Sequence, residues 1–327
     1  MKKLIVFLLI ASFLIFIPMN ILAAEKVFKL GTNTAPSDSA NLAERKFAEI
    51  LKEKSNGRLE VKVYDSAKLG DHLETLEGLR NGTIEMTMTS LGYMAGYEKA
   101  FGVFDLPYIF SDYDHMFRFL DGEGGEFIDS MLEKYGFKVL GYFYFGVRET
   151  ANKTRPIYKP EDMNGIKIRV QESKASIQGL GAMGATPTPV PWSELYMALQ
   201  QNVVDGMENS TALIYSSKVY ELLPYLSLTN HLYYPAIILI SKQIWDNLSS
   251  EDQKLIMEAQ DEAVAWQREY ALDEELKMIE VLEEKGMKVN EADVPAFIEA
   301  VKPLKKKFEE ELGENARKLI EIIDSLR

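Results

Sequence analysis

The side chains best suited to chemistry in this sequence are two arginines, a tryptophan and an asparagine near the ends of predicted strands and helices. Arg148 ends an apolar run, Arg169 lies on a predicted strand, Trp192 follows PVP at the start of a predicted helix, and Asn209 closes the strand-like VVDGMEN. A planar guanidinium can hold both oxygens of a carboxylate. A hydrogen bond to a charged group contributes about 1.5–3 kcal/mol. These residue types therefore suit the binding of an organic acid.

The segment GIKIRVQES, residues 165–173, leaves two interpretations of Arg169 open. Its apolar residues alternate with Lys167 and Arg169 at a period of two, which predicts a half-buried strand. Most charges on the polar face of a strand are simply hydrated, and this is the first interpretation. The second is that Arg169 faces a cleft, because ligands of open α/β sheets bind at the carboxyl ends of strands.

Other motifs give little support for a cofactor, a metal or an active site. GLGAMG, residues 179–184, matches G-x-G-x-x-G but follows a predicted helix and leads into TPTP, which excludes a dinucleotide fingerprint. The three histidines, His72, His115 and His231, have no metal-binding spacing, and the chain has no cysteine. We expect neither a cofactor nor a metal. No set of residues singles out a catalytic centre, and we predict that the protein is not an enzyme.

Net charge excludes another class of partner. The formal charge is −13 over 327 residues, so the protein repels nucleic acid and anionic lipid. An anionic ligand would have to be bound by local cationic side chains, against the repulsion of the protein's net negative charge.

The N-terminus predicts export. MKK is followed by an apolar run that ends in small residues, and then by the charged EKVFKL. This pattern is typical of a secretory signal peptide, residues 1–24, cleaved after Ala23 or Ala24. The alternative is an uncleaved N-terminal anchor, because the apolar run approaches the length that spans a membrane. No other segment is long and apolar enough to do so.

Hydrophobic periodicity predicts two α/β units that position the polar residues. The first has strands at 26–33, 59–65 and 83–90 with helices at 38–57 and 70–82 between them. An apolar strand, Val139–Val147, leads to the second unit, which has helices at 172–180 and 192–201 separated by a TPTP loop. A further strand at 231–242 precedes a long helix, 251–284, and two charged amphipathic helices. Because no flexible linker separates the units, we expect two lobes joined by crossing strands.

Four blocks of sequence resemble one family. They are SNGRLEVKVYDSAKLGD, VRETANKTRPIYKPEDMNGIKIRVQES, GATPTPVPWSELYMALQQNVVDGMENS and LSLTNHLYYPAIILISKQIWDNLS. The chain, from about Lys26 to its C-terminus, resembles the extracytoplasmic solute-binding proteins of tripartite ATP-independent periplasmic (TRAP) transporters, of the C4-dicarboxylate-binding (DctP) type. The last three blocks keep the family's order and nearly its spacing.

The resemblance implies an α/β fold. It is a two-lobed periplasmic-binding-protein clamp, in which each lobe is a mixed sheet flanked by helices and a long helix spans both lobes. We expect residues 25–147 and 235–275 to form the first lobe, and residues 148–234 and 276–327 the second.

The resemblance also assigns roles to the four residues named first. Arg169 matches the arginine that pairs with the ligand carboxylate, and Arg148 matches an assisting arginine near the hinge. Trp192 matches the aromatic that packs over the ligand, and Asn209 matches an asparagine that hydrogen-bonds it.

Four first-lobe residues are implied as further contacts: Asn33, Ser90, Asp71 and His72. The sequence departs from the family where DGMENS places Met207 and Ser210 instead of an amide and a proline. We expect Met207 to make the pocket wall less polar and the dicarboxylate preference weaker. Ser90 stands where some sialic-acid binders carry an acid, which argues against that ligand.

We therefore expect an exported, periplasmic or extracytoplasmic, monomeric protein. It would capture a small organic acid, such as a C4-dicarboxylate, a hexuronate or a related sugar or hydroxy acid, in a cleft between its lobes. It would deliver this acid to the small and large membrane subunits of a TRAP transporter. The alternatives are a ligand-binding protein of an ATP-driven importer or sensor system, and a secreted α/β enzyme.

Overall fold

The computed structural model describes residues 24–327. The predicted signal peptide, residues 1–24, lies outside the described residues except for Ala24. Within the described range, no helix combines the length and the apolar character needed to span a bilayer.

Nine strands among the described residues form one hydrogen-bonded sheet, in the order β2-β1-β3-β8-β4-β7-β5-β6, with β9 paired to β8. The strands are β1 (Lys26–Gly31), β2 (Leu59–Tyr64), β3 (Met86–Ser90), β4 (Phe137–Asn152), β5 (Lys167–Val170), β6 (Thr186–Pro189), β7 (Gly206–Asn209), β8 (Tyr225–Ser241) and β9 (Lys288–Glu291). β1 runs parallel to β2 and β3, and β5 runs parallel to β6 and β7, as βαβ connections require.

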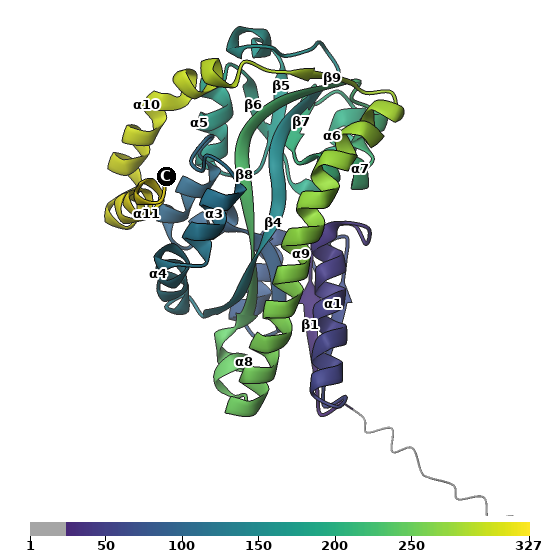
Figure 1. Cartoon of the computed structure of the whole chain (residues 1–327), viewed down its shortest axis with the longest axis vertical. Helices are drawn as coiled ribbons and strands as arrows, with labels where there is room; N and C mark the ends of the chain where they lie inside the picture. The colour runs from purple at the N-terminus through teal and green to yellow at the C-terminus, as the bar shows by residue number, and fades with distance from the viewer. Residues whose placement is uncertain (1–23) are drawn as a thin grey trace, which may run out of the picture.

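Two long strands, β4 and β8, join the lobes. They have 16 and 17 residues, run antiparallel and extend through the molecule in Figure 1. Their pairing is interrupted between Tyr144 and Val147 and again between Arg148 and Thr150. Gly146 in the first interruption has φ +92°, and a Cβ there would lie 2.5 Å from the Cβ of Ser210. The crossing point is therefore irregular and tightly packed, and it carries Arg148.

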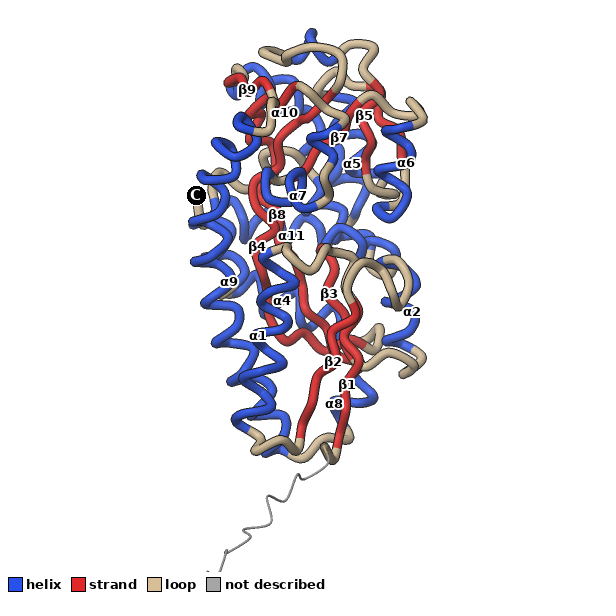
Figure 2. The backbone as a smooth tube through the Cα atoms, turned by 90° about the vertical axis from the view of Figure 1, so that its right-hand side faces the viewer, coloured by secondary structure: helices blue, strands red, loops and turns tan. Residues whose placement is uncertain are grey.

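Helices cover the sheet. They are α1 (Ser39–Lys54), α2 (His72–Arg80), α3 (Tyr113–Leu120), α4 (Glu123–Glu133), α5 (Lys174–Ala182), α6 (Leu195–Gln200), α7 (Thr211–Ser216), α8 (Lys242–Asp246), α9 (Ser250–Glu284), α10 (Val294–Leu312) and α11 (Glu314–Ser325). Short 3₁₀ turns include η1 (Leu91–Gly96), η2 (Lys99–Asp105) and η4 (Trp192–Glu194). Helix α9 packs on α1 and β4 at one end and on α7 and β9 at the other, and Figures 1 and 2 show it running along both lobes. The predicted spanning helix is confirmed.

Separate apolar cores define the two lobes. The first-lobe core contains buried residues of β1, β3, α1 and α3, together with residues from 137–145 of β4 and 232–240 of β8. The second lobe has two clusters, one around Leu199 and Leu226 and one around Ile168 and Phe297. Leu319 and Ile323 of α11 are buried in the first-lobe core. The C-terminal helix therefore differs from the expected division, which gave 276–327 to the second lobe.

Two local predictions are wrong at the edge of the second lobe. The TPTP segment is strand β6 instead of a loop, and the edge position tolerates its prolines because one side needs no ladder bonds. Strand β5 is not half-buried: Ile168, Arg169 and Val170 are all buried. Arg169 on its polar face therefore meets other groups of the protein, whereas Lys167 on the same face stays partly exposed.

Candidate functional site

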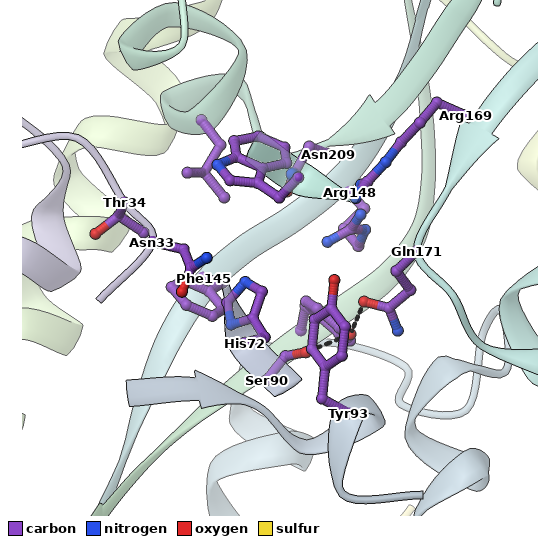
Figure 3. Close-up of a pocket in the computed structure, with 13 residues that line it drawn as sticks. Asn33, Thr34, His72, Ser90, Tyr93, Phe145, Arg148, Arg169, Gln171 and Asn209 are labelled. Atoms are coloured by element: carbon purple, nitrogen blue, oxygen red, sulfur yellow. Dashed lines mark hydrogen bonds between the residues drawn. The ribbon is translucent and has the colours of Figure 1, made fainter. Parts of the chain in front are cut away.

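A cavity lies between the lobes at the crossing of β4 and β8. It holds about 410 Å³ of space not filled by atoms, a figure that includes its open mouth. Its lining residues come from the first lobe (Asn33, Thr34, His72, Ser90, Tyr93), the connecting strands (Phe145, Arg148, Tyr234) and the second lobe (Arg169, Gln171, Trp192, Asn209, Leu213). Figure 3 shows these side chains converging from several elements.

Arg169 projects into this cavity from the middle of β5. It is 2% exposed, and its Nε donates a hydrogen bond to the Val190 carbonyl at 2.8 Å. Its guanidinium carbon lies 5.5 Å from the centre of the Trp192 ring. Among the described residues, its Nη2 has no hydrogen-bond partner. Burial lowers the pKa of Arg169 and nearby Arg148 lowers it further, although the group remains a cation. The cavity therefore holds a buried positive charge with an unused donor.

Arg148 is arranged differently because it is already paired. Its Nε and Nη2 donate to the Glu208 carboxylate, and Nη2 also donates to the Glu208 carbonyl at 2.9 Å. Its guanidinium carbon lies 4.6 Å from the Tyr234 ring centre. Burial acts to raise the pKa of Glu208, but Arg148 and the hydrogen bond from His231 lower it to about 2. Glu208 therefore neutralises Arg148 inside the protein.

Trp192 and Asn209 lie on the second-lobe side of the cavity. Trp192 begins η4 and places its ring beside Arg169, while Asn209 ends β7 and is 3% exposed. The Asn209 Oδ1 accepts from the Ser210 backbone N–H at 2.9 Å, which orients the amide. Asn209 is one of the residues that line the cavity.

The first-lobe candidates divide into three that line the cavity and one that does not. Asn33, Ser90 and His72 are lining residues, whereas Asp71 is the N-cap of α2. Asp71 Oδ1 accepts from Asn33 Nδ2 at 2.5 Å, and its Oδ2 accepts from Ser193 Oγ of the second lobe at 2.8 Å. Asp71 thus orients a lining residue and joins the lobes.

His72 is neutral in this setting. Burial lowers its pKa to about 4, and Arg169 adds to the lowering against the opposing charge of Asp71. Its Nδ1 lies 3.0 Å from the Thr89 hydroxyl, and its ring stacks on Tyr93 with centroids 4.4 Å apart. His72 is therefore a hydrogen-bonding wall residue.

A buried polar network closes the floor of the cavity. The Tyr234 hydroxyl lies 2.8 Å from Ser90 Oγ, 2.9 Å from Asp105 Oδ1 and 2.8 Å from Gln171 Oε1. Gln171 Nε2 donates to Asp105 Oδ1 at 2.6 Å. Burial raises the pKa of Asp105. Figure 3 shows Ser90 and Gln171 meeting at this network from different lobes.

Sequence reasoning missed several lining residues, and two residues that it expected at the pocket, Asp71 and Met207, do not line the cavity. Gln171 directly follows β5, so the rule that ligands gather at strand ends could have found it. Tyr234 and Phe145 lie inside apolar strands and carry no such signal. Met207 is buried in the second-lobe core and does not line the cavity, so its expected effect on the pocket wall is wrong.

Within residues 24–327, no three His, Asp or Glu side chains are grouped as a metal site would require. Of the acids near the cavity, Glu208 pairs with Arg148, and Asp71 accepts hydrogen bonds from Asn33 and Ser193. The arrangement suits the non-covalent binding of a small anion.

Comparisons with known proteins are consistent with this geometry. The model of the family described as bacterial extracellular solute-binding protein, family 7 (DctP), matches residues 30–311. The chain is 34% identical over 281 residues to the 2,3-diketo-L-gulonate-binding periplasmic protein YiaO of Escherichia coli, covering 86% of this chain and 85% of that protein.

Two solved structures share the fold closely. The sugar acid binding protein of Advenella mimigardefordensis in complex with galactonate is 30% identical, with a TM-score of 0.89, covering 93% of this chain and 100% of that one. A TRAP periplasmic solute-binding protein of Sulfurospirillum deleyianum with bound succinate is 28% identical, with a TM-score of 0.88, covering 93% and 100%.

Proposed function

The chain belongs to family 7 of the bacterial extracellular solute-binding proteins, and from this premise we propose that it captures a small organic acid between its lobes for a TRAP transporter. The related proteins with bound galactonate and succinate support an organic acid as the class of ligand. The name of the Escherichia coli relative supports a periplasmic location, and the predicted signal peptide agrees with it.

The observation that carries this proposal is the state of Arg169. Its Nη2 is buried in the cavity without a hydrogen-bond partner among the described residues. A buried donor that is left unsatisfied costs about 1–3 kcal/mol, and more when the group is charged. A carboxylate beside Arg169 would remove this cost and receive a charge-assisted hydrogen bond.

The other lining residues take supporting roles in the proposal. Trp192 is a flat apolar wall over the ligand, and Asn209 donates from its amide. Asn33, Ser90 and His72 meet the polar part of the ligand from the first lobe. Arg148 borders the ligand but gives most of its hydrogen-bonding capacity to Glu208. Asp71 acts by holding Asn33 and Ser193.

Binding and closure are coupled in this proposal because both lobes supply lining residues. An acid that bridges the lobes has more contacts in the closed form, and this difference in affinity drives closure. The closed, loaded, monomeric protein would then present itself to the small and large membrane subunits of the transporter.

The proposal is tested by a thermal-shift screen over organic acids, followed by calorimetry and mass spectrometry of the bound compound. We expect a subset of acids to raise the melting temperature as 1:1 ligands and to be recovered unchanged. Chemical conversion of the ligand would favour a secreted enzyme. Uptake in proteoliposomes that requires an ATPase, and not a TRAP subunit pair, would favour an ATP-driven importer.

A further inference from the structure

We propose that Asp105 carries a proton when the lobes are closed, so that capture of the ligand takes up one proton from solvent at this residue. This inference rests on the proposed function and deepens it, because it makes a proton a second species that the closed protein holds. It follows from the number of hydrogen atoms available to the buried network that joins the lobes at the floor of the cavity.

The network takes its members from both lobes. In the first lobe, Asp105 ends η2 and Ser90 ends β3. Tyr234 lies on the connecting strand β8, and Gln171 follows β5 in the second lobe. All four side chains are buried, and Ser90 and Gln171 approach from different lobes in Figure 3. The Tyr234 hydroxyl contacts an oxygen of each of the other three residues, and the Gln171 amide also contacts Asp105 Oδ1. The network therefore contains four hydrogen-bonding contacts.

These four contacts need four hydrogen atoms, one between each pair of heavy atoms. Ser90 and Tyr234 supply one hydroxyl hydrogen each. The Gln171 amide supplies one N–H, to Asp105 as assigned or to Tyr234 if the amide is turned over. An ionised Asp105 supplies none. One of the contacts, none of which is longer than 2.9 Å, would then bring two oxygens together without a hydrogen between them.

A proton on Asp105 Oδ1 completes the network. Asp105 and Ser90 then both donate to the Tyr234 oxygen. Tyr234 donates to Gln171 Oε1, and Gln171 Nε2 donates to Asp105 Oδ1. The other oxygen of Asp105, Oδ2, is buried and has no hydrogen-bond partner among the described residues. A neutral carboxyl tolerates this position better than a carboxylate, whose charge needs hydrogen-bond donors when it is buried.

The packing around Asp105 removes it from water. The residue is 1% exposed, and a Cβ on Gly92 of η1 would lie 2.1 Å from Asp105 Oδ1, so the backbone there packs directly against the carboxyl. Burial raises the pKa of Asp105. The side chains of Ser173, Tyr234 and Gln171 act to lower this pKa, but burial outweighs them.

The charged and titratable groups on the neighbouring elements do not reverse this balance. From β4, the positive charge of Arg148 acts to lower the pKa of Asp105, but Arg148 is itself paired with Glu208 of β7. From η1, Tyr93 is a neutral phenol, because burial raises its pKa to about 12. From β8, His231 has a pKa lowered by burial and bonds to Glu208. The neighbours therefore leave the proton on Asp105.

Opening of the lobes would release this proton. Gln171 leaves with the second lobe, so the Tyr234 hydroxyl can donate to Asp105, and water can hydrate the carboxyl. A hydrated aspartate has a pKa of about 3.9, so Asp105 is ionised in the open protein at neutral pH. Closure must then add one proton. Because the closed form binds one more proton than the open form, affinity for the ligand falls as pH rises above about 4, by up to about tenfold per pH unit.

The test is to count the protons taken up during binding. Galactonate is the first probe, because its single carboxyl stays ionised above about pH 5.5 and adds nothing to the count. If galactonate does not bind, the acid found by the screen replaces it, with a correction for its own ionisation. Calorimetry of the full mature protein at about pH 6, in phosphate and in Bis-Tris buffers of different ionisation enthalpy, should show uptake of about one proton per ligand.

Binding without proton uptake would overturn this inference and leave the proposed function standing. Binding of no organic acid would overturn the proposed function, and this inference with it.

Asp105→Asn tests whether Asp105 is the group that takes up the proton. The asparagine amide supplies a permanent hydrogen in place of the proton, so the variant should bind the ligand with about one proton fewer taken up and with a weaker pH dependence. A purely structural role for Asp105 would weaken binding at every pH without changing the proton count. Asp246→Asn is the control, because it breaks an exposed ion pair with Lys242 in α8, and it should take up as many protons as the wild type.

Circular dichroism checks that each variant is folded. If Asp105→Asn does not fold, Gln171→Leu replaces it. This change removes the contacts that require the additional hydrogen and leaves Ser90 and Tyr234 with one hydrogen for each remaining contact. Proton uptake should again fall by about one. Uptake equal to that of the wild type in either folded variant would overturn the inference.

Discussion

Ser193 donates a hydrogen bond to Asp71 from one lobe to the other, with Oγ 2.8 Å from Oδ2. The other oxygen of the same carboxylate accepts from Asn33, a lining residue of the cavity. One side chain therefore couples the contact between the lobes to the position of a group that we assign to the ligand. Ser193 is exposed, so this link can break without disturbing a core.

Ser193→Ala should speed ligand release. The lost hydrogen bond is expected to cost about 1 kcal/mol of the closed form, because it lies at the surface and exchanges with water. Stopped-flow measurement should give a dissociation rate that is several-fold higher, with little change in the association rate. The control is Ser130→Ala, whose hydroxyl bonds only to the Phe127 carbonyl in α4. Equal release rates in the two variants would rule out the coupling.

Trp192 should report binding by fluorescence. Its ring lies beside the Arg169 guanidinium, whereas Trp245 in α8 and Trp266 in α9 do not line the cavity. A ligand-induced fluorescence change is therefore expected in the wild type and in Trp245→Phe, and it should vanish in Trp192→Phe. Trp192→Ala should also weaken binding by about 0.5–2 kcal/mol through loss of the aromatic wall. If Trp192→Phe kept the whole ligand-induced fluorescence change, the ligand would bind away from Trp192.

Asp38 gives the fold a measurable pH dependence. Burial raises the pKa of this N-cap carboxyl to about 7, whereas the unfolded chain has a value of about 3.9. The folded state therefore binds more protons between these values, and Asp38 lowers stability progressively as pH rises from about 4 to about 7.

Asp38→Asn removes this titration and keeps the cap, because asparagine caps helices as well as aspartate does. Urea unfolding at several pH values should show the variant gaining stability over the wild type as pH rises through this window. A stability difference that is independent of pH would contradict the assignment. Comparing the two proteins cancels the contributions of buried acids that do not interact with Asp38; Glu44 is not one of them, because the charge of Asp38 helps to raise its pKa.

The order of strands and helices follows from periodicity, and most predicted elements are present. The failures are instructive. Residues 186–189 pair as an edge strand because tertiary contact overrides the turn preference of proline. Helix α11 returns to the first lobe because its buried face, with Leu319 and Ile323, matches a surface there. A local pattern carries no information about which lobe an amphipathic helix will join.

The site was predictable only in part, because its geometry depends on how distant strands pair. Arg148 and Arg169 were equivalent as residue types, yet Glu208 pairs with one and leaves the other free. Which arginine is paired depends on the register of β4 against β7. This register places Glu208 opposite Thr150, and the Glu208 side chain then lies beside Arg148. Tyr234 and Phe145 reach the cavity only because the two long strands cross there, which alternation alone does not reveal.

The most direct test of the account is calorimetry of Arg169→Ala against Lys167→Ala with the acid identified by screening. Both residues lie on β5, but Lys167 bonds to the Asn202 carbonyl at the surface and does not line the cavity. We predict that Arg169→Ala loses about 2–5 kcal/mol of binding free energy, since a buried carboxylate would be left without its partner. Lys167→Ala should bind as the wild type does, and both variants should remain folded by circular dichroism. Wild-type affinity in folded Arg169→Ala would contradict the central claim that Arg169 holds the ligand carboxylate.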